Sequence, residues 1–228
     1  MNFTQNKFTP FITSQKYPLL ITLVFFLVVC YVGFSYHNYW IVDQDGIHLL
    51  NGGEQIISGD WQNVHFVTTP TTAAIFYAIL NSVFNDGFTL MKLISIISGS
   101  ATVLIVFFII KNVSNYKTAL IGQLLFAFNP WFSFFSMQAE IDVLAVLLVC
   151  ASLYFATKKN LKPSDMIIMG ALLGASFMIR YQSIIIIITM IIFLLIRNKK
   201  IHINLSYIGL AVSLFLTAAT PRSFRSSF

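Results

Sequence analysis

Long apolar runs that almost no charge interrupts dominate this sequence. Of its 228 residues, 57% are hydrophobic and only 10% are charged, whereas a soluble domain carries roughly a quarter of its residues as charges. An apolar run of about 20 residues can cross the hydrocarbon core of a membrane as a helix. The pattern excludes an ordinary soluble enzyme and a disordered chain. It predicts an all-α, multi-pass integral membrane protein in contact with membrane lipids.

The runs predict a bundle of about seven membrane-embedded helices. We expect these at 18–36, 88–110, 120–135, 141–157, 166–178, 184–196 and 206–219. The runs 166–178 and 184–196 have 13 residues each, or about 20 Å of helix, which is short of a full span. A polar stretch that contains Arg180 separates them. They are either one long helix with an arginine at mid-depth or two short helices that meet at a polar tip.

The loop charges favour the two-helix reading and set an orientation. With a cytoplasmic N-terminus and a hairpin at 166–196, ten of the fourteen Lys and Arg residues face the cytoplasm, as the positive-inside rule requires. Seven of the eight acidic residues then face outward. The net charge of +6 therefore belongs to the rims of membrane spans, and no nucleic acid is expected as a partner.

This topology defines the expected domain organisation. Residues 1–17 are a cytoplasmic N-terminus, 18–219 form the transmembrane domain, and 220–228 are an irregular tail. Residues 37–87 form an extracytoplasmic loop that carries interfacial helices. The topology requires 71–84 not to cross, and a 14-residue apolar segment suits a helix that lies in the membrane interface. We expect the cell membrane as the location.

The outer loop carries the first group of candidate functional residues. Asp43 and Asp45 precede a segment, 47–57, whose apolar residues fall on one helical face, and Ser58-Gly59-Asp60 follows as a stop signal. A carboxylate at this position could act as a general base toward a hydroxyl. The alternative is that both aspartates cap the helix and solvate the loop.

A second group lies where two later spans begin. Glu140 and Asp142 stand at the outer end of the 141–157 run, and Asp142 is expected to sit deeper than Glu140. Arg180 interrupts the apolar stretch, and a cation at membrane depth normally faces a partner or a polar cavity. Two readings stay open: a buried ion pair with Asp142 or Glu140, or an anion site for a phosphate.

Several other patterns carry little functional information. His37, His48 and His65 share the outer loop with four acidic residues, which allows a divalent metal, but their spacings fit no ligand pattern. No nucleotide-binding or Ser/His/Asp signature is present. We therefore expect no metal and no other cofactor.

Taken in order, these motifs resemble the membrane glycosyltransferases of the GT-C fold. The resemblance rests on five features: the loop from Asp43-Gln44-Asp45-Gly46 to Ser58-Gly59-Asp60-Trp61, a helix that starts after Pro70, Asn129-Pro130 at a span end, an acid at the head of the next span, and the break at Arg180-Tyr181-Gln182. It is strongest for the protein O-mannosyltransferase and aminoarabinose-transferase types, with an archaeal branch as one option.

The resemblance implies an activity and roles for particular residues. A sugar would pass from a polyprenyl- or dolichyl-phosphate donor to a hydroxyl of a protein, lipid or glycan acceptor, on the extracytoplasmic side and with inversion. Asp43 or Asp45 matches the catalytic base, and Asp142 matches the second acid of the family. Arg180 matches the basic residue that lies near the lipid phosphate in the family. The complete set of expected substrate-binding residues is Arg180, Glu140, Lys92 and Gln182.

Two departures from the family leave other functions open. The family has a Pro-Pro pair where this chain has Thr69-Pro70-Thr71, and its members are longer. The chain ends just after a span, so we expect a C-terminally truncated and inactive transferase as one possibility. A non-catalytic assembly partner is a second reading. A small-solute transporter is a third, although it would need midplane breaks and commonly an internal repeat.

Overall fold

The computed structural model describes residues 16–35, 44–60 and 71–197. Within these ranges all regular elements are α-helices and there are no strands, which confirms the all-α prediction. The helices are α2 (Lys16–Ser35), α3 (Gln44–Ile57), α4 (Thr71–Phe84), α5 (Gly87–Val113), α6 (Tyr116–Ala127), α7 (Pro130–Ser136), α8 (Asp142–Thr157), α9 (Pro163–Ile179) and α10 (Ser183–Arg197).

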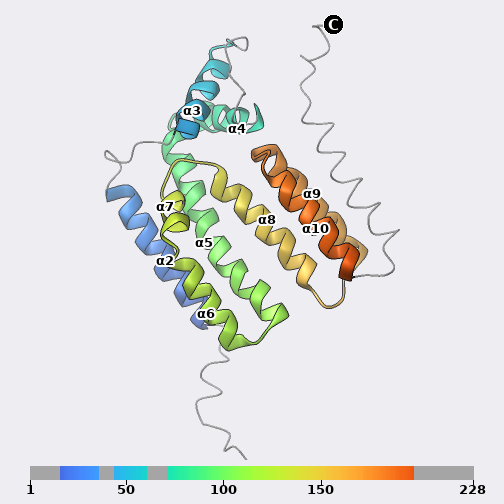
Figure 1. Cartoon of the computed structure of the whole chain (residues 1–228). Helices are drawn as coiled ribbons and strands as arrows, with labels where there is room; N and C mark the ends of the chain where they lie inside the picture. Colours follow the sequence, from blue (N-terminus) through green and yellow to red (C-terminus); the bar gives the residue numbers. More distant parts are fainter. Residues whose placement is uncertain (1–15, 36–43, 61–70, 198–228) are drawn as a thin grey trace, which may run out of the picture.

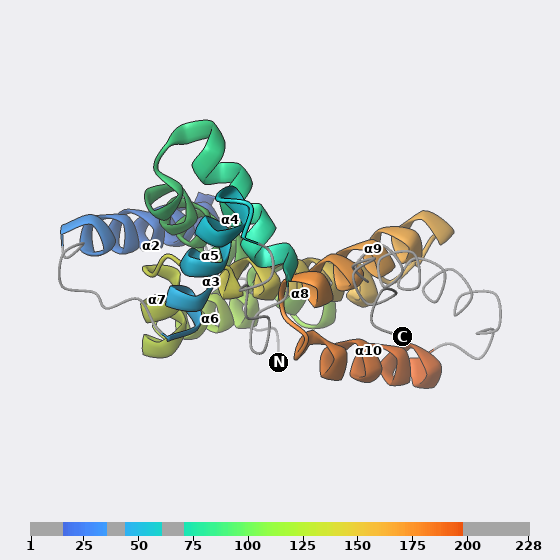
Figure 2. The ribbon, with the colours of Figure 1, turned by 90° about the horizontal axis from the view of Figure 1, so that it is seen from above.

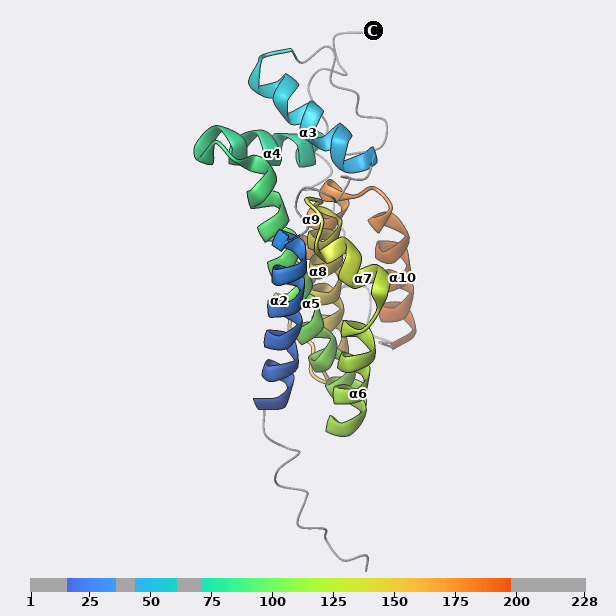
Figure 3. The ribbon, with the colours of Figure 1, turned by 90° about the vertical axis from the view of Figure 1, so that its left-hand side faces the viewer.

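The helices form an elongated bundle with a cap across one end. α5 is central and packs against α2, α6 and α8, and α8 in turn packs against α9 and α10. From above, α2 lies at one end of the bundle and the α9–α10 pair at the other (Figure 2). α3 and α4 pack on each other and lie across the end of the bundle (Figures 1 and 3).

Fewer helices are long enough to cross a membrane than the sequence predicts. Among the described residues only α2 and α5 are long and apolar enough, and the bent pair α6–α7 would make a third span. α8, α9 and α10 contain 16, 17 and 15 residues, or about 22 to 26 Å of helix, short of a core of about 30 Å. The expectation of about seven membrane helices is therefore not supported. The predicted run 206–219 lies outside the described residues.

The apolar run predicted at 120–135 is broken in the structure, because the chain bends by 64° between α6 and α7. The residue before a proline is disfavoured in the α conformation, and Asn129 is extended ahead of Pro130. The Asn129 side chain accepts a hydrogen bond from the Phe132 N–H at 3.0 Å and so caps α7. Asn129 and Pro130 thus end one helix and start the next.

The predicted hairpin in the apolar stretch 166–196 is confirmed. α9 ends at Ile179 and α10 begins at Ser183, and the two helices are joined at the capped end and run alongside each other in opposite directions (Figures 1 and 2). Their shared core with α8 consists of buried aliphatic side chains and methionines: Ala156, Met169, Leu173, Ile187, Met190 and Leu194. The chain reverses direction at Arg180-Tyr181-Gln182, which brings the polar tip to the capped end of the bundle.

The cap is formed by the two helices predicted in the 37–87 loop. α4 has the predicted bounds, and α3 ends at Ile57 just before Gly59, whose φ of 80° only glycine adopts readily. A Cβ on Gly53 would overlap the Tyr77 ring, so Gly53 permits the close approach of α3 and α4. Leu49 and Tyr77 share a buried cluster with Ile141, Ala145 and Ile179, which fixes the cap on the bundle.

The helices of the bundle alternate in direction, so the charged loops that join them lie at its two ends. The α5–α6 and α8–α9 turns, with Lys111, Lys117 and Lys158 to Lys162, lie at the end opposite to α3 and α4 (Figure 1). Glu54, Asp86 and the residues around the α9–α10 break lie at the capped end. This is the arrangement that the charge pattern predicts. The side of the membrane that each end faces stays a prediction.

Candidate functional site

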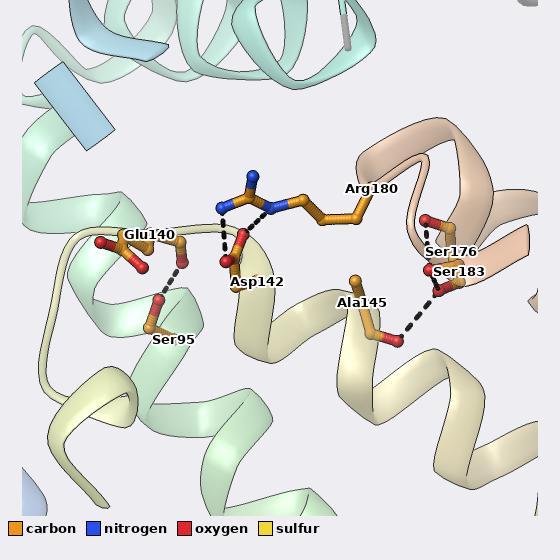
Figure 4. A network of polar contacts seen from close by, with 7 residues as sticks. All are labelled: Ser95, Glu140, Asp142, Ala145, Ser176, Arg180 and Ser183. Carbon is orange, nitrogen blue, oxygen red and sulfur yellow. Dashed lines mark hydrogen bonds and ion pairs between the residues drawn. The ribbon is translucent and has the colours of Figure 1, made fainter. Parts of the chain in front are cut away.

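A bidentate ion pair joins the α9–α10 break to the start of α8. Arg180 is the C-cap of α9 and its backbone is extended, at φ −142° and ψ 117°. Its Nε donates to Asp142 Oδ1 and its Nη2 to Asp142 Oδ2 (Figure 4). The parallel arrangement of a guanidinium and a carboxylate is the strongest form of a charged hydrogen bond. Of the two candidate partners, Asp142 is therefore one that Arg180 binds.

A cavity of about 440 Å³ lies beside this pair, between α8 and α10. Its lining changes character along its length. Polar side chains form one part of the lining, and alanine and branched aliphatic residues form the other. The lining residues are Asp142, Ala145, Val146, Val149, Arg180, Gln182, Ser183 and Ile186.

The α8 part of this lining follows one face of the helix. Asp142, Ala145, Val146 and Val149 are spaced by three or four residues, so they lie one above the other. From Asp142 to Val149 the helix rises by about 10 Å. The cavity therefore has a charged group at one end and an apolar wall of two helical turns below it. A ligand with a polar headgroup and an apolar tail matches this gradient.

Glu140, the other acid at the start of α8, is buried. The Glu140 residue is 2% exposed, whereas the Asp142 side chain is 32% exposed. The relative depth of the two acids in the membrane stays a prediction. The α7–α8 loop folds inward over α5, and Ser95 Oγ on α5 donates to the Glu140 carbonyl (Figure 4). Glu140 does not line the cavity.

Lys92 lies on α5, where this helix packs against α2. It is 2% exposed, and its Nζ lies 5.6 Å from the centroid of the Phe34 ring on α2. Its Cε is also close to Gly33, so the side chain packs in the seam between α2 and α5. The structure thus brings Asp142, Arg180 and Gln182 together at the cavity, and Lys92 is not part of its lining.

The first-loop acids can be placed only through α3. Asp43 lies outside the described residues, and Asp45 is the second residue of α3. α3 lies across the same end of the bundle as the start of α8 and the α9–α10 break (Figure 3), and Leu49 anchors it to the cluster that contains Ile141 and Ile179. The helix that carries Asp45 and the α8–α10 cavity therefore share one end of the molecule.

The phenol of Tyr77 is the perturbed titratable group of the cap. Burial raises the pKa of Tyr77 above 10.0, and the carboxylates of Glu54 and Asp86 raise it further. Among the described residues, no three His, Cys, Asp or Glu side chains gather closely enough to hold a metal ion. His37 and His65 lie outside those residues, and the expected absence of a metal stays a prediction.

Sequence reasoning missed two polar residues at the break and the apolar wall of the cavity. Ser176 and Ser183 are both buried, and their hydroxyl oxygens are 2.8 Å apart. Val146, Val149 and Ile186 are ordinary residues of apolar helices, and only the packing of α8 on α10 places them together. The one available signal for the serines was their position on either side of the Arg180 break.

The comparisons with known proteins identify one family. A family model described as dolichyl-phosphate-mannose-protein mannosyltransferase matches residues 68–221, more than half of the chain. No curated protein and no solved structure matches the chain. The matched region contains α4 to α10, and therefore the whole cavity with Asp142 and Arg180. It begins after α3, so it does not include Asp43 or Asp45.

Proposed function

The chain belongs to the dolichyl-phosphate-mannose-protein mannosyltransferase family, and we propose that it moves a sugar from a polyprenyl- or dolichyl-phosphate donor to an acceptor hydroxyl on the extracytoplasmic side of the membrane. The family comprises membrane glycosyltransferases that use dolichyl-phosphate sugar donors and protein acceptors. The long apolar helices α2 and α5 agree with an integral membrane protein. The α8–α10 cavity supports the proposal best.

The two parts of the cavity suit the two parts of such a donor. The planar guanidinium of Arg180 offers paired N–H donors that match phosphate oxygens, and Gln182 supplies an amide at the same end. Val146, Val149 and Ile186 provide apolar contacts for the first isoprene units. Because the donor carries its sugar on a lipid phosphate, the reaction needs no nucleotide site, and the sequence shows no nucleotide motif.

The proposed reaction is a single displacement. A carboxylate of the first loop, Asp43 or Asp45, takes the proton of the acceptor hydroxyl, and the oxygen attacks the anomeric carbon with inversion. The bond between that carbon and the phosphate oxygen breaks, and the lipid phosphate leaves with the electron pair. Arg180 stabilises the negative charge that grows on the phosphate in a site of low polarity.

Asp142 acts on Arg180 in this proposal. In the structure its carboxylate occupies two N–H donors of the guanidinium. In this proposal the donor phosphate takes over these two N–H groups, so it competes with Asp142. Once displaced, the Asp142 carboxylate lies beside the anomeric centre, where it can orient the acceptor. Asp142 is thus the counter-charge of Arg180 before the donor binds and the second acid of the site afterwards.

The test is sugar transfer from dolichyl-phosphate-mannose by the purified full chain in detergent or liposomes. Asp43→Asn with Asp45→Asn should lower the transfer rate by about 10²- to 10⁴-fold, the usual contribution of a general base. Glu54→Gln is the matched control, because Glu54 is an exposed acid of the same helix α3. Unchanged transfer in the double variant would refute the first-loop base. If the unmodified chain shows no transfer at all, the role of non-catalytic assembly partner is supported instead.

A further inference from the structure

The α9–α10 break is attached to α8 at a second point, one turn below the ion pair. Ser176 on α9 and Ser183 on α10 are 0% and 6% exposed. Their hydroxyl oxygens are 2.8 Å apart, and Ser176 Oγ donates to the carbonyl oxygen of Ala145 at 3.2 Å (Figure 4). Three helices thus meet at two buried hydroxyl groups.

The two hydroxyls link all three helices. Each serine hydroxyl carries one proton and can accept at its oxygen. Ser176 Oγ reaches the Ala145 carbonyl of α8, and Ser183 Oγ reaches both Ser176 Oγ and the Ser176 carbonyl, the latter at 3.4 Å. The chain of contacts therefore runs from α10 through α9 to α8, and we refer to Ser176 and Ser183 together as the serine clamp.

The clamp also holds both backbone polar groups of Arg180. The Arg180 N–H donates to the Ser176 carbonyl at 2.9 Å, and the Ser183 N–H donates to the Arg180 carbonyl at 3.0 Å. Arg180 is thus fixed between the same two residues whose side chains bond to each other. Ala145, the acceptor on α8, lies three residues after Asp142, the partner of the guanidinium.

We propose that Ser176 and Ser183 are positioning residues that hold Arg180 where its guanidinium can bind the donor phosphate. This inference rests on the proposed function and adds two residues to it. An arginine side chain has considerable rotamer freedom, so the direction of its backbone decides where the guanidinium can reach. Loss of the clamp removes the side-chain hydrogen bonds between α9 and α10 at the break, and the phosphate site becomes less well formed.

The direct test is the affinity of the purified full chain for dolichyl phosphate. Ser183→Ala and Ser176→Ala should each weaken binding by about fivefold, the equivalent of one ordinary hydrogen bond. Ser152→Ala is the matched control: Ser152 is 0% exposed and bonds from α8 to the Met169 carbonyl of α9 at 3.4 Å, away from the break. The control should bind as the wild type does.

A double variant separates positioning from a general loss of structure. If the clamp acts through Arg180, Ser183→Ala should cause no further loss of dolichyl phosphate affinity when Arg180→Gln is already present. A further loss in that background would overturn the positioning role. Ser183→Thr and Ser183→Val differ only in the hydroxyl group, so only the valine variant should bind weakly, whatever the added volume does to folding.

The outcomes also distinguish the two proposals. If Arg180→Gln leaves dolichyl phosphate affinity unchanged, the phosphate site itself is refuted, together with the role of Arg180 in the proposed function. If Arg180→Gln weakens binding but the clamp variants match Ser152→Ala, the proposed function stands and the serine clamp is refuted. Equal binding by the threonine and valine variants would refute it in the same way.

Discussion

Replacement of Asp142 by asparagine should destabilise the protein and at the same time tighten its binding of dolichyl phosphate. Asparagine has nearly the shape of aspartate but no charge, so one of the two hydrogen bonds from Arg180 keeps an acceptor and the guanidinium loses its counter-charge. The folded state without donor becomes less favourable. The donor phosphate, however, no longer has to displace a carboxylate from the N–H groups that it needs.

The exposure of the pair sets the size of both effects. The side chains of Arg180 and Asp142 are 13% and 32% exposed, so the pair lies between an exposed ion pair, which contributes about 0 to 1 kcal/mol, and a fully buried pair, whose disruption costs about 3 to 5 kcal/mol. We expect a loss of about 1 to 2 kcal/mol in the free energy of unfolding. If dolichyl phosphate no longer spends this free energy on displacing the carboxylate, its affinity rises about 5- to 30-fold.

The assay combines thermal unfolding with titration of dolichyl phosphate into the purified full chain. Asp165→Asn is the matched control. It breaks a different ion pair, Lys158 Nζ to Asp165 Oδ1 at 2.9 Å, at the other end of the bundle. The control should lower stability and leave the affinity unchanged. If Asp142→Asn weakens dolichyl phosphate binding, the carboxylate assists the phosphate instead of competing with it, and the exchange at Arg180 is refuted.

Three further outcomes follow from the packing and the caps. Gly99→Ala should cost about 1 to 3 kcal/mol of unfolding free energy, because its Cβ would lie 2.8 Å from the Ser136 Cβ, and Ser136→Gly in the same chain should recover part of this. Asn129→Ala removes the cap of α7 and should lower the unfolding free energy by about 1 kcal/mol. Burial, and then two nearby carboxylates, raise the pKa of Tyr77 above 10.0; the folded state therefore holds this proton more tightly, and its stabilising effect is lost as the pH rises above 10. Unfolding measured between pH 8 and 11 should show a smaller alkaline loss for Tyr77→Phe than for the wild type.

The sequence predicts most helix positions because apolar runs and their breakers are local signals. The predicted segments 71–84 and 141–157 agree with α4 and α8 within a residue, and the polar break around Arg180 is where α9 ends. The 120–135 run is divided into α6 and α7 because hydrophobicity extends through Asn129 and Pro130 while the backbone cannot continue as one helix there. Run length also predicts more spans than the described helices support by their length, since short apolar helices can be buried against neighbours without crossing.

The site was predictable only in part, because its contacts join distant positions. The sequence identified Arg180 as a cation that needs a partner, yet Asp142 lies 38 positions away and Glu140 was an equal candidate. Which of the two acids binds Arg180 depends on the direction of the loop before α8, and this loop buries Glu140 beside Ser95. Ser176 and Ser183 could not be assigned at all, since a serine in an apolar helix has no periodic signature and its partner depends on how α8 packs on α9.

The ends of three helices support the proposed phosphate position in the bundle. α8 and α10 both begin at the cavity, with Asp142 and Ser183, and α9 ends there next to Arg180. Helix N-termini carry partial positive charge and attract anions, whereas a C-terminus favours a cation, each by about 0.3 to 1 kcal/mol at the surface. Asp142 and Arg180 therefore each sit at the helix end that favours their charge. In the proposed exchange, a phosphate that replaces the Asp142 carboxylate at the guanidinium would stay close to Arg180 and to the N-termini of α8 and α10, where an anion is favoured.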